Sequence, residues 1–127
     1  MPKSLKLGDV MTKNVITVGE KATVKAAVEL MNKYDIGCLV VMERKKPIGI
    51  VTERDVLKRV LLSPKNTKTT KVNDMLMRKV SEIMSKPLIV GKTQTDLRDG
   101  VRLMMEWKIK KLPIVEKSSS AFCVRLI

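Results

Sequence analysis

The eight residues Ile36-Gly37-Cys38-Leu39-Val40-Val41-Met42-Glu43 have a copy 73 positions later, Ile109-Lys110-Lys111-Leu112-Pro113-Ile114-Val115-Glu116. At the same offset the match extends back to Met11 and Met84 without a gap. Further identical pairs are Lys13/Lys86, Ile16/Ile89, Val28/Val101, Leu30/Leu103 and Met31/Met104. A match at one fixed offset indicates that the chain contains two copies of one structural unit.

Each copy carries the same local signals. In the first copy, the β-branched run 15–18 predicts a strand, and Thr23 is a candidate N-cap for a helix over 24–34. In the second copy, residues 88–90 predict the matching strand, and Asp96 is a candidate cap for a helix over 97–107. Apolar residues at helical spacing in both stretches favour a core role for the methionine and aromatic positions.

A hairpin and a second helix complete the first copy. Residues 39–42 have the composition of a buried strand, 43–47 of a polar turn, and 48–52 of the returning strand. A helix is expected to begin near Glu53 and to stop before Pro64, which cannot continue it. The order is therefore β-α-β-β-α. Residues 72–84 predict one or two short helical turns.

A single unit of about 55 residues would be marginal alone, whereas two copies can bury each other's apolar faces. We therefore predict an α+β fold of two tandem β-α-β-β(-α) repeats related by pseudo-two-fold symmetry. Residues 1–127 form a single module in this prediction. Repeat one covers about 7–62, a connector about 63–78, and repeat two about 79–127, where it is incomplete at its C-terminus.

Composition excludes several kinds of chemistry. The chain has no histidine, and its two cysteines lack metal-ligand spacing, so His-dependent catalysis and a His or Cys metal site are excluded. We expect no enzyme activity and no catalytic cofactor. The apolar runs are short and the N-terminus has no hydrophobic signal region, so we expect a cytoplasmic protein without a membrane partner.

The formal net charge of +13 leaves two interpretations open. Such an excess attracts polyanions, whether nucleotide phosphates or nucleic acid. Scattered lysines can equally form an ordinary solvated surface. The sequence has only three aromatic residues, Tyr34, Trp107 and Phe122, fewer than a protein that stacks single-stranded bases normally needs.

Three groups of residues carry a resemblance to a known family. They are residues 9–12 with their copy 82–85, residues 36–41 with their copy 109–115, and residues 49–56, Gly-Ile-Val-Thr-Glu-Arg-Asp-Val. In this order they resemble tandem CBS domains, named after cystathionine β-synthase and called Bateman modules when paired. The resemblance implies clefts between the repeats that bind an adenine-containing small molecule: AMP, ADP, ATP, S-adenosylmethionine or NAD.

The segment from Thr52 to Asp55 fits such a role chemically. A strand gives way to a helix there, so backbone N–H groups face one spot. Asp55 can accept two hydrogen bonds from a ribose diol, Thr52 can donate or accept beside it, and Arg54 suits phosphate. The alternative is that Thr52 and Asp55 only cap the helix, as a capping box does.

The resemblance also implies two sets of ligand-binding residues. The first cleft would contain Thr52, Arg54, Asp55, Gly37, Cys38, Ser85, Val90, Ile109 and Lys110. Val90 and Ile109 would sandwich the adenine, and the small Gly37 and Cys38 would allow close approach. A second, weaker cleft would use Thr12, Thr17, Ile36, Gly37, Lys110 and Lys111.

The sequence departs from the family pattern after Glu116, where no Thr-x-x-Asp segment and no further acidic residue follow. We therefore expect one useful adenine-nucleotide site per chain, and a homodimer that covers apolar surface at the incomplete repeat. The leading hypothesis is a regulatory or sensory module that binds an adenosine-containing ligand. The alternative is a basic nucleic-acid-binding protein on a CBS scaffold.

Overall fold

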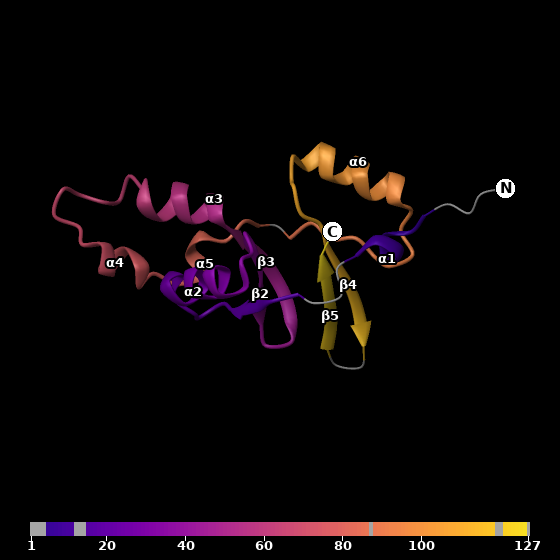
Figure 1. Ribbon diagram of the computed structural model, residues 1–127, viewed down its shortest axis with the longest axis horizontal. Helices are drawn as coiled ribbons and strands as arrows, with labels where there is room; N and C mark the ends of the chain where they lie inside the picture. Colours follow the sequence, from indigo (N-terminus) through magenta and orange to yellow (C-terminus); the bar gives the residue numbers. More distant parts are fainter. Residues whose placement is uncertain (1–4, 12–14, 87, 119–120, 127) are drawn as a thin grey trace. The chain divides into compact units, whose positions relative to one another are not determined.

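The computed structural model describes residues 5–11, 15–86, 88–118 and 121–126, and they divide into two compact units (Figure 1). The central unit comprises residues 16–88. The terminal unit comprises the residues up to 15 together with those from 89 onward. Within the described parts of the chain, no helix has the length and hydrophobicity needed to cross a membrane.

The central unit contains a three-stranded sheet with order β1-β2-β3. Its elements are β1 (Thr17–Gly19), α2 (Val24–Tyr34), β2 (Cys38–Glu43), β3 (Lys46–Thr52), α3 (Glu53–Val56), the π-helix η1 (Leu57–Leu61), α4 (Val72–Leu76) and α5 (Val80–Ile83). β1 runs parallel to β2, with Val18 opposite Val41, and β2 and β3 form an antiparallel hairpin. The predicted hairpin and the short helical turns between 72 and 84 are confirmed.

Local signals set the bounds of α2. The Thr23 hydroxyl accepts a hydrogen bond from the Ala26 amide at 3.1 Å, as predicted for an N-cap. Asp35 ends the helix in the left-handed conformation, with φ of 51°. The buried residues of α2 share one face and join the core of this unit with residues of β2 and β3. That core includes Val18, Val24, Ala27, Met31, Leu39, Val41, Val51, Val60, Val80 and Ile83.

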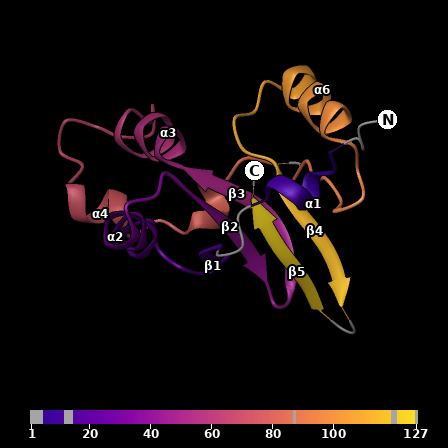
Figure 2. The same cartoon turned by 45° about the vertical axis from the view of Figure 1, so that its right-hand side comes forward.

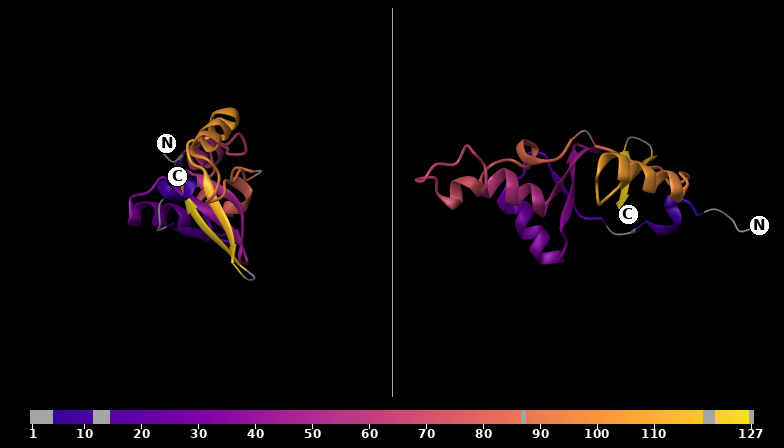
Figure 3. Two further views of the ribbon diagram at one scale, coloured as in Figure 1. Left: turned by 90° about the vertical axis from the view of Figure 1, so that its right-hand side faces the viewer. Right: turned by 90° about the horizontal axis from the view of Figure 1, so that it is seen from above.

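The helix that follows Thr52 differs from the prediction in one respect. It begins at Glu53 and ends at Leu61 as expected, but its second half is a π-helix in which the Leu62 amide donates to Leu57 O at 3.0 Å. The Asn66 side chain donates to Val60 O at 2.7 Å and so satisfies a carbonyl at this helix end. The stretch from Leu62 to Lys71, between η1 and α4, lies at the end of the central unit away from its strands (Figure 3).

The terminal unit contains α1 (Leu7–Val10), α6 (Leu97–Trp107), β4 (Pro113–Ser118) and β5 (Ala121–Leu126). β4 and β5 form the antiparallel hairpin that ends the chain (Figure 2), so the predicted returning strand after residue 121 is confirmed. The strand predicted at 88–90 is wrong. Only Gly91 pairs with β4, because its amide donates to Pro113 O at 2.9 Å and its carbonyl accepts from the Val115 amide at 3.0 Å.

The structure confirms the α+β fold with tandem repeats. α1 and α5 lie 73 residues apart, as do α2 and α6, and the pairs Val18/Val41 and Gly91/Ile114 are related by the same offset. The opening helices are exchanged between the units, however. α1 packs in the terminal unit, where the backbone of Lys6 forms an isolated β-bridge with Asp96. α5 packs in the central unit, where the backbone of Lys79 forms an isolated β-bridge with Thr23. The pseudo-two-fold relation and the domain bounds stay predictions.

Two glycines of the terminal unit make room for Leu7, which is only 1% exposed. An added Cβ would lie 2.5 Å from Leu7 Cδ1 at Gly91, and 2.5 Å from Leu7 Cδ2 at Gly100. At the offset of 73, the corresponding residues of the central unit are Val80, Val18 and Ala27, all in its core. Compared with the central unit, the terminal unit therefore has a larger residue on its opening helix, Leu7 in place of Val80. It has smaller residues opposite that helix, Gly91 and Gly100 in place of Val18 and Ala27.

We expect Leu7→Ala to destabilise the protein by about 2–5 kcal/mol, because the two glycines cannot fill the cavity that it leaves. Unfolding in urea, followed by circular dichroism, measures the change. The control is Leu5→Ala two residues away, where the side chain is 54% exposed and the effect should stay within about 0.5 kcal/mol. Equal effects of the two substitutions would contradict this account of the core.

Candidate functional site

The candidate site lies where β3 ends and α3 begins. Thr52 is the N-cap of α3, in an extended conformation with φ of −120° and ψ of 165°. Its hydroxyl accepts from the Asp55 amide at 3.1 Å, and its amide donates to Asp55 Oδ2 at 2.9 Å. These two hydrogen bonds form a capping box, which the sequence offered as the alternative to ligand binding by Thr52 and Asp55. The capping box is confirmed. A binding role for the same residues stays a prediction.

The pairing of β2 with β3 brings the start of β2 to the same place. Cys38 lies opposite Thr52 in the ladder, and the Glu53 amide donates to Gly37 O at 3.0 Å. An added Cβ at Gly37 would lie 3.2 Å from Glu53 Oε1, so the glycine allows the first turn of α3 to approach β2 closely. Cys38 is buried.

Ser85 joins the site from a segment thirty residues further along the chain. It forms an isolated antiparallel bridge with Ile50, in which its amide donates to Ile50 O at 2.7 Å. The Ser85 hydroxyl lies 3.0 Å from Asp55 Oδ1 and 3.2 Å from Oδ2. Gly49 permits this approach, since an added Cβ there would lie 2.6 Å from Met84 Sδ and 3.2 Å from Ser85 O.

Arg59 connects the carboxylate with the same distant segment. Its Nη1 donates to the carbonyls of Ile83 and Met84, both at 3.0 Å, and its Nε lies 3.9 Å from Asp55 Oδ1. Asp55 itself is only 7% exposed, so its charge is balanced by hydrogen bonds and one nearby cation rather than by water. Sequence reasoning missed Arg59. Its position four residues after Asp55 on a predicted helix was the available signal.

The structure thus brings together three predicted site residues, Thr52, Asp55 and Ser85, by direct hydrogen bonds. Arg54 is exposed on the first turn of α3. Of the residues predicted for the second cleft, Thr17 lies in β1 opposite Val40, and Ile36 is half-buried just before β2. Thr12 lies outside the described residues.

The other predicted site residues belong to the terminal unit. Val90 is exposed beside Gly91, and Ile109 packs against the apolar cluster that contains Leu7. Lys110 and Lys111 are exposed between α6 and β4. The predicted grouping of these residues with Thr52 and Asp55 stays a prediction.

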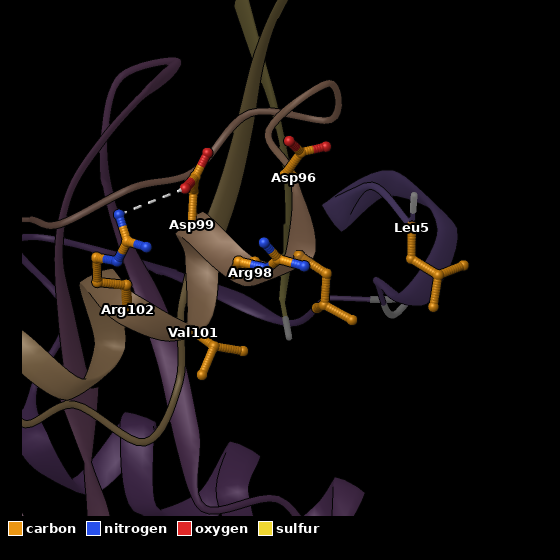
Figure 4. Close-up of a pocket in the computed structure, with 7 residues that line it drawn as sticks. Leu5, Asp96, Arg98, Asp99, Val101 and Arg102 are labelled. Carbon is orange, nitrogen blue, oxygen red and sulfur yellow. Dashed lines mark ion pairs between the residues drawn. The ribbon is translucent and has the colours of Figure 1, made fainter. Parts of the chain in front are cut away.

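The terminal unit has a groove of about 640 Å³ beside the start of α6 (Figure 4). It is lined by Leu5, Asp96, Leu97, Arg98, Asp99, Val101 and Arg102. Its charges are largely paired within the unit, since Lys6 binds Asp96 and Arg102 lies 3.9 Å from Asp99. The described residues contain no cluster of carboxylates and cysteines that could hold a metal ion.

Known proteins similar to this chain share one family. A protein-family model described as the CBS domain matches residues 7–62 and 80–120. The chain is 31% identical to the CBS domain-containing protein YhcV of Bacillus subtilis over 118 residues, which cover 93% of this chain and 78% of that protein. It is 33% identical over 122 residues to an uncharacterized protein of Methanocaldococcus jannaschii, covering 92% of this chain but 29% of that longer protein.

Two further relatives bear on function and fold. An inosine-5′-monophosphate dehydrogenase of Methanocaldococcus jannaschii is 30% identical over 112 residues, but these cover only 20% of the enzyme against 87% of this chain. An uncharacterized conserved protein of Pyrococcus horikoshii has a similar structure, with a TM-score of 0.78 and 26% identity, covering 100% of this chain and 88% of that one.

The CBS domain pair of protein MJ0100, solved with 5′-methylthioadenosine and S-adenosyl-L-methionine, also has a TM-score of 0.78. It is 19% identical to this chain, covering 98% of this chain and 90% of that one, and at this identity the likeness shows the fold alone.

We expect Asp55→Ala to destabilise the protein by about 1–3 kcal/mol, because the Thr52 amide and the Ser85 hydroxyl lose their acceptor. Urea unfolding of the variant measures the change. The matched control is Asp99→Ala, which removes an exposed carboxylate 3.9 Å from Arg102 and should alter stability by no more than about 0.5 kcal/mol. If the two variants were equally stable, Asp55 would not organise the start of α3.

Proposed function

Because the chain belongs to the CBS domain family, we propose that it is a regulatory module in which Asp55, held by Thr52 and lying beside Ser85, binds the ribose of an adenosine-containing ligand. The observation that carries this proposal is the buried Asp55 carboxylate at the end of β3, hydrogen-bonded to residues from two separate segments. A carboxylate is an acceptor-only group that suits the two hydroxyls of a ribose diol.

The surroundings of Asp55 support a nucleotide rather than a free sugar. Arg54 is exposed one residue away, so its guanidinium can reach a phosphate without crossing the buried carboxylate. The proposed ligand class is AMP, ADP, ATP, S-adenosylmethionine or NAD. The two adenosyl ligands of the MJ0100 domain pair, a protein of the same fold, are consistent with this class.

The proposal does not include catalysis. The dehydrogenase relative matches this chain over only 20% of its own length, so that likeness gives no reason to propose its activity for this chain.

We propose that residues 1–127 act as one CBS-pair module that assembles as a homodimer. A similar structure, 30% identical with a TM-score of 0.76, is a hexameric CBS-CP12 protein of bloom-forming cyanobacteria. Sedimentation equilibrium distinguishes a dimer from a higher assembly.

A second candidate function is binding of a nucleic acid. The stretch 57–81 carries seven Lys and Arg residues against the single acid Asp74. Of these cations, Lys58, Arg59, Lys65, Lys68, Lys71 and Lys79 are exposed. Phosphate-backbone binding weakens steeply as salt concentration rises, whereas a pocket with direct ribose contacts depends on salt far less. Titrations at two salt concentrations therefore separate the two functions.

Calorimetric titration with adenosine, AMP, ATP and S-adenosylmethionine tests the proposed function. We expect Arg54→Ala to weaken AMP and ATP about threefold to tenfold and to leave adenosine nearly unchanged, because the arginine acts on phosphate. The control is Lys45→Ala, which removes an exposed cation in the turn between β2 and β3. Absence of binding for all four ligands at millimolar concentration would overturn the proposal.

A further inference from the structure

The two oxygens of the Asp55 carboxylate are unequally occupied. Oδ2 lies within hydrogen-bond distance of three donors: the Thr52 amide at 2.9 Å, the Thr52 hydroxyl at 3.1 Å and the Ser85 hydroxyl at 3.2 Å. Oδ1 lies 3.0 Å from the Ser85 hydroxyl and 3.9 Å from Arg59 Nε. The single Ser85 proton is therefore shared between both oxygens, and Oδ1 has the larger remaining capacity to accept.

A ribose diol offers two hydroxyl donors side by side, and a bidentate contact needs one acceptor position on each oxygen. Asp55 is 7% exposed, so a ligand cannot simply add to a solvated carboxylate. With Ser85 in place, Oδ2 is already surrounded by donors. One ligand hydroxyl can bind at Oδ1, but the second requires that the Ser85 hydroxyl leave.

The backbone of Ser85 is fixed, while its hydroxyl can turn away. The bridge to Ile50 and the two hydrogen bonds from Arg59 to the carbonyls of Ile83 and Met84 hold the main chain. The segment that contains Ser85 lies close against β3, because a Cβ added at Gly49 would be only 3.2 Å from Ser85 O. Release of Asp55 therefore takes place by rotation about the Cα–Cβ bond of Ser85.

We propose that Ser85 is an intramolecular competitor of the ligand, and that it sets how strongly the site prefers a complete ribose diol. This inference rests on the proposed function. A ligand with both hydroxyls must displace the Ser85 hydroxyl from the carboxylate, whereas a ligand with one hydroxyl can bind at Oδ1 with Ser85 in place. Ser85 thus weakens the binding of adenosine relative to 2′-deoxyadenosine.

Calorimetry with these two nucleosides on the full chain tests the proposal. We expect Ser85→Ala to bind adenosine about threefold to tenfold more tightly, since a competing hydrogen bond is gone, and to bind 2′-deoxyadenosine as the unchanged protein does. Ser85→Thr keeps the hydroxyl and should behave like the unchanged protein. Ser81→Ala, in α5 of the same segment, is the matched control and should alter neither affinity.

A further variant separates loss of the hydrogen bond from loss of side-chain volume at position 85. Ser85→Cys keeps nearly the same volume with a much weaker donor, so it should shift adenosine binding in the same direction as the alanine variant. Weaker adenosine binding by Ser85→Ala and Ser85→Cys, or equal changes for both nucleosides, would overturn the competitor role and leave the proposed function standing. If the unchanged protein binds neither nucleoside nor any phosphorylated adenosine, the proposed function itself fails.

Discussion

The buried carboxylate of Asp55 is the interaction on which the central unit depends. A charge that has left water must find donors, and here they come from the strand before α3 and from the segment that ends at Ser85. One side chain therefore links the end of β3, the first turn of α3 and the segment that follows α5. Arg59 reinforces the arrangement, because it lies near the carboxylate and also binds the carbonyls of the returning segment.

Small residues allow these contacts to form in both units. Gly49 lets the chain at Met84 and Ser85 lie directly on β3, and Gly91 with Gly100 leaves space for Leu7. Because protein interiors are packed at crystalline density, each approach requires that side-chain volume be absent from the opposite element. The two copies meet this requirement with different residues at equivalent positions, which is how a duplicated sequence can diverge while its fold is kept.

The sequence alone predicts what local chemistry determines. Thr23 and the apolar spacing of 24–34 suffice for α2, and the copy at 97–107 follows from the offset. The exchange of α1 and α5 could not be predicted, because identical local signals do not say which copy an opening helix packs on. The hydrogen bond between Ser85 and Asp55 spans thirty residues, so local signals do not predict it, and only the family resemblance placed the two residues in one cleft. The hydrogen bond from Asn66 to Val60 O, which satisfies a carbonyl of η1, comes from a residue beyond the helix, and helical periodicity does not indicate it.

Asp55 can cap α3 and, under the proposed function, also bind a ribose, because its hydrogen-bond donors come from different segments of the chain. The Thr52 amide and hydroxyl belong to the same turn as the carboxylate, so under the proposed function they stay in contact with it when a ligand binds. Among the hydrogen-bond donors to Asp55 in the part of the chain that the structure describes, Ser85 alone comes from a separate segment, so under the proposed function it is the donor that a ribose replaces. Ser85 also lies near the C-terminal end of the central unit, whose last residue is Leu88. Under the proposed function, a ribose that displaces the Ser85 hydroxyl therefore acts close to one of the two places where the chain passes between the units.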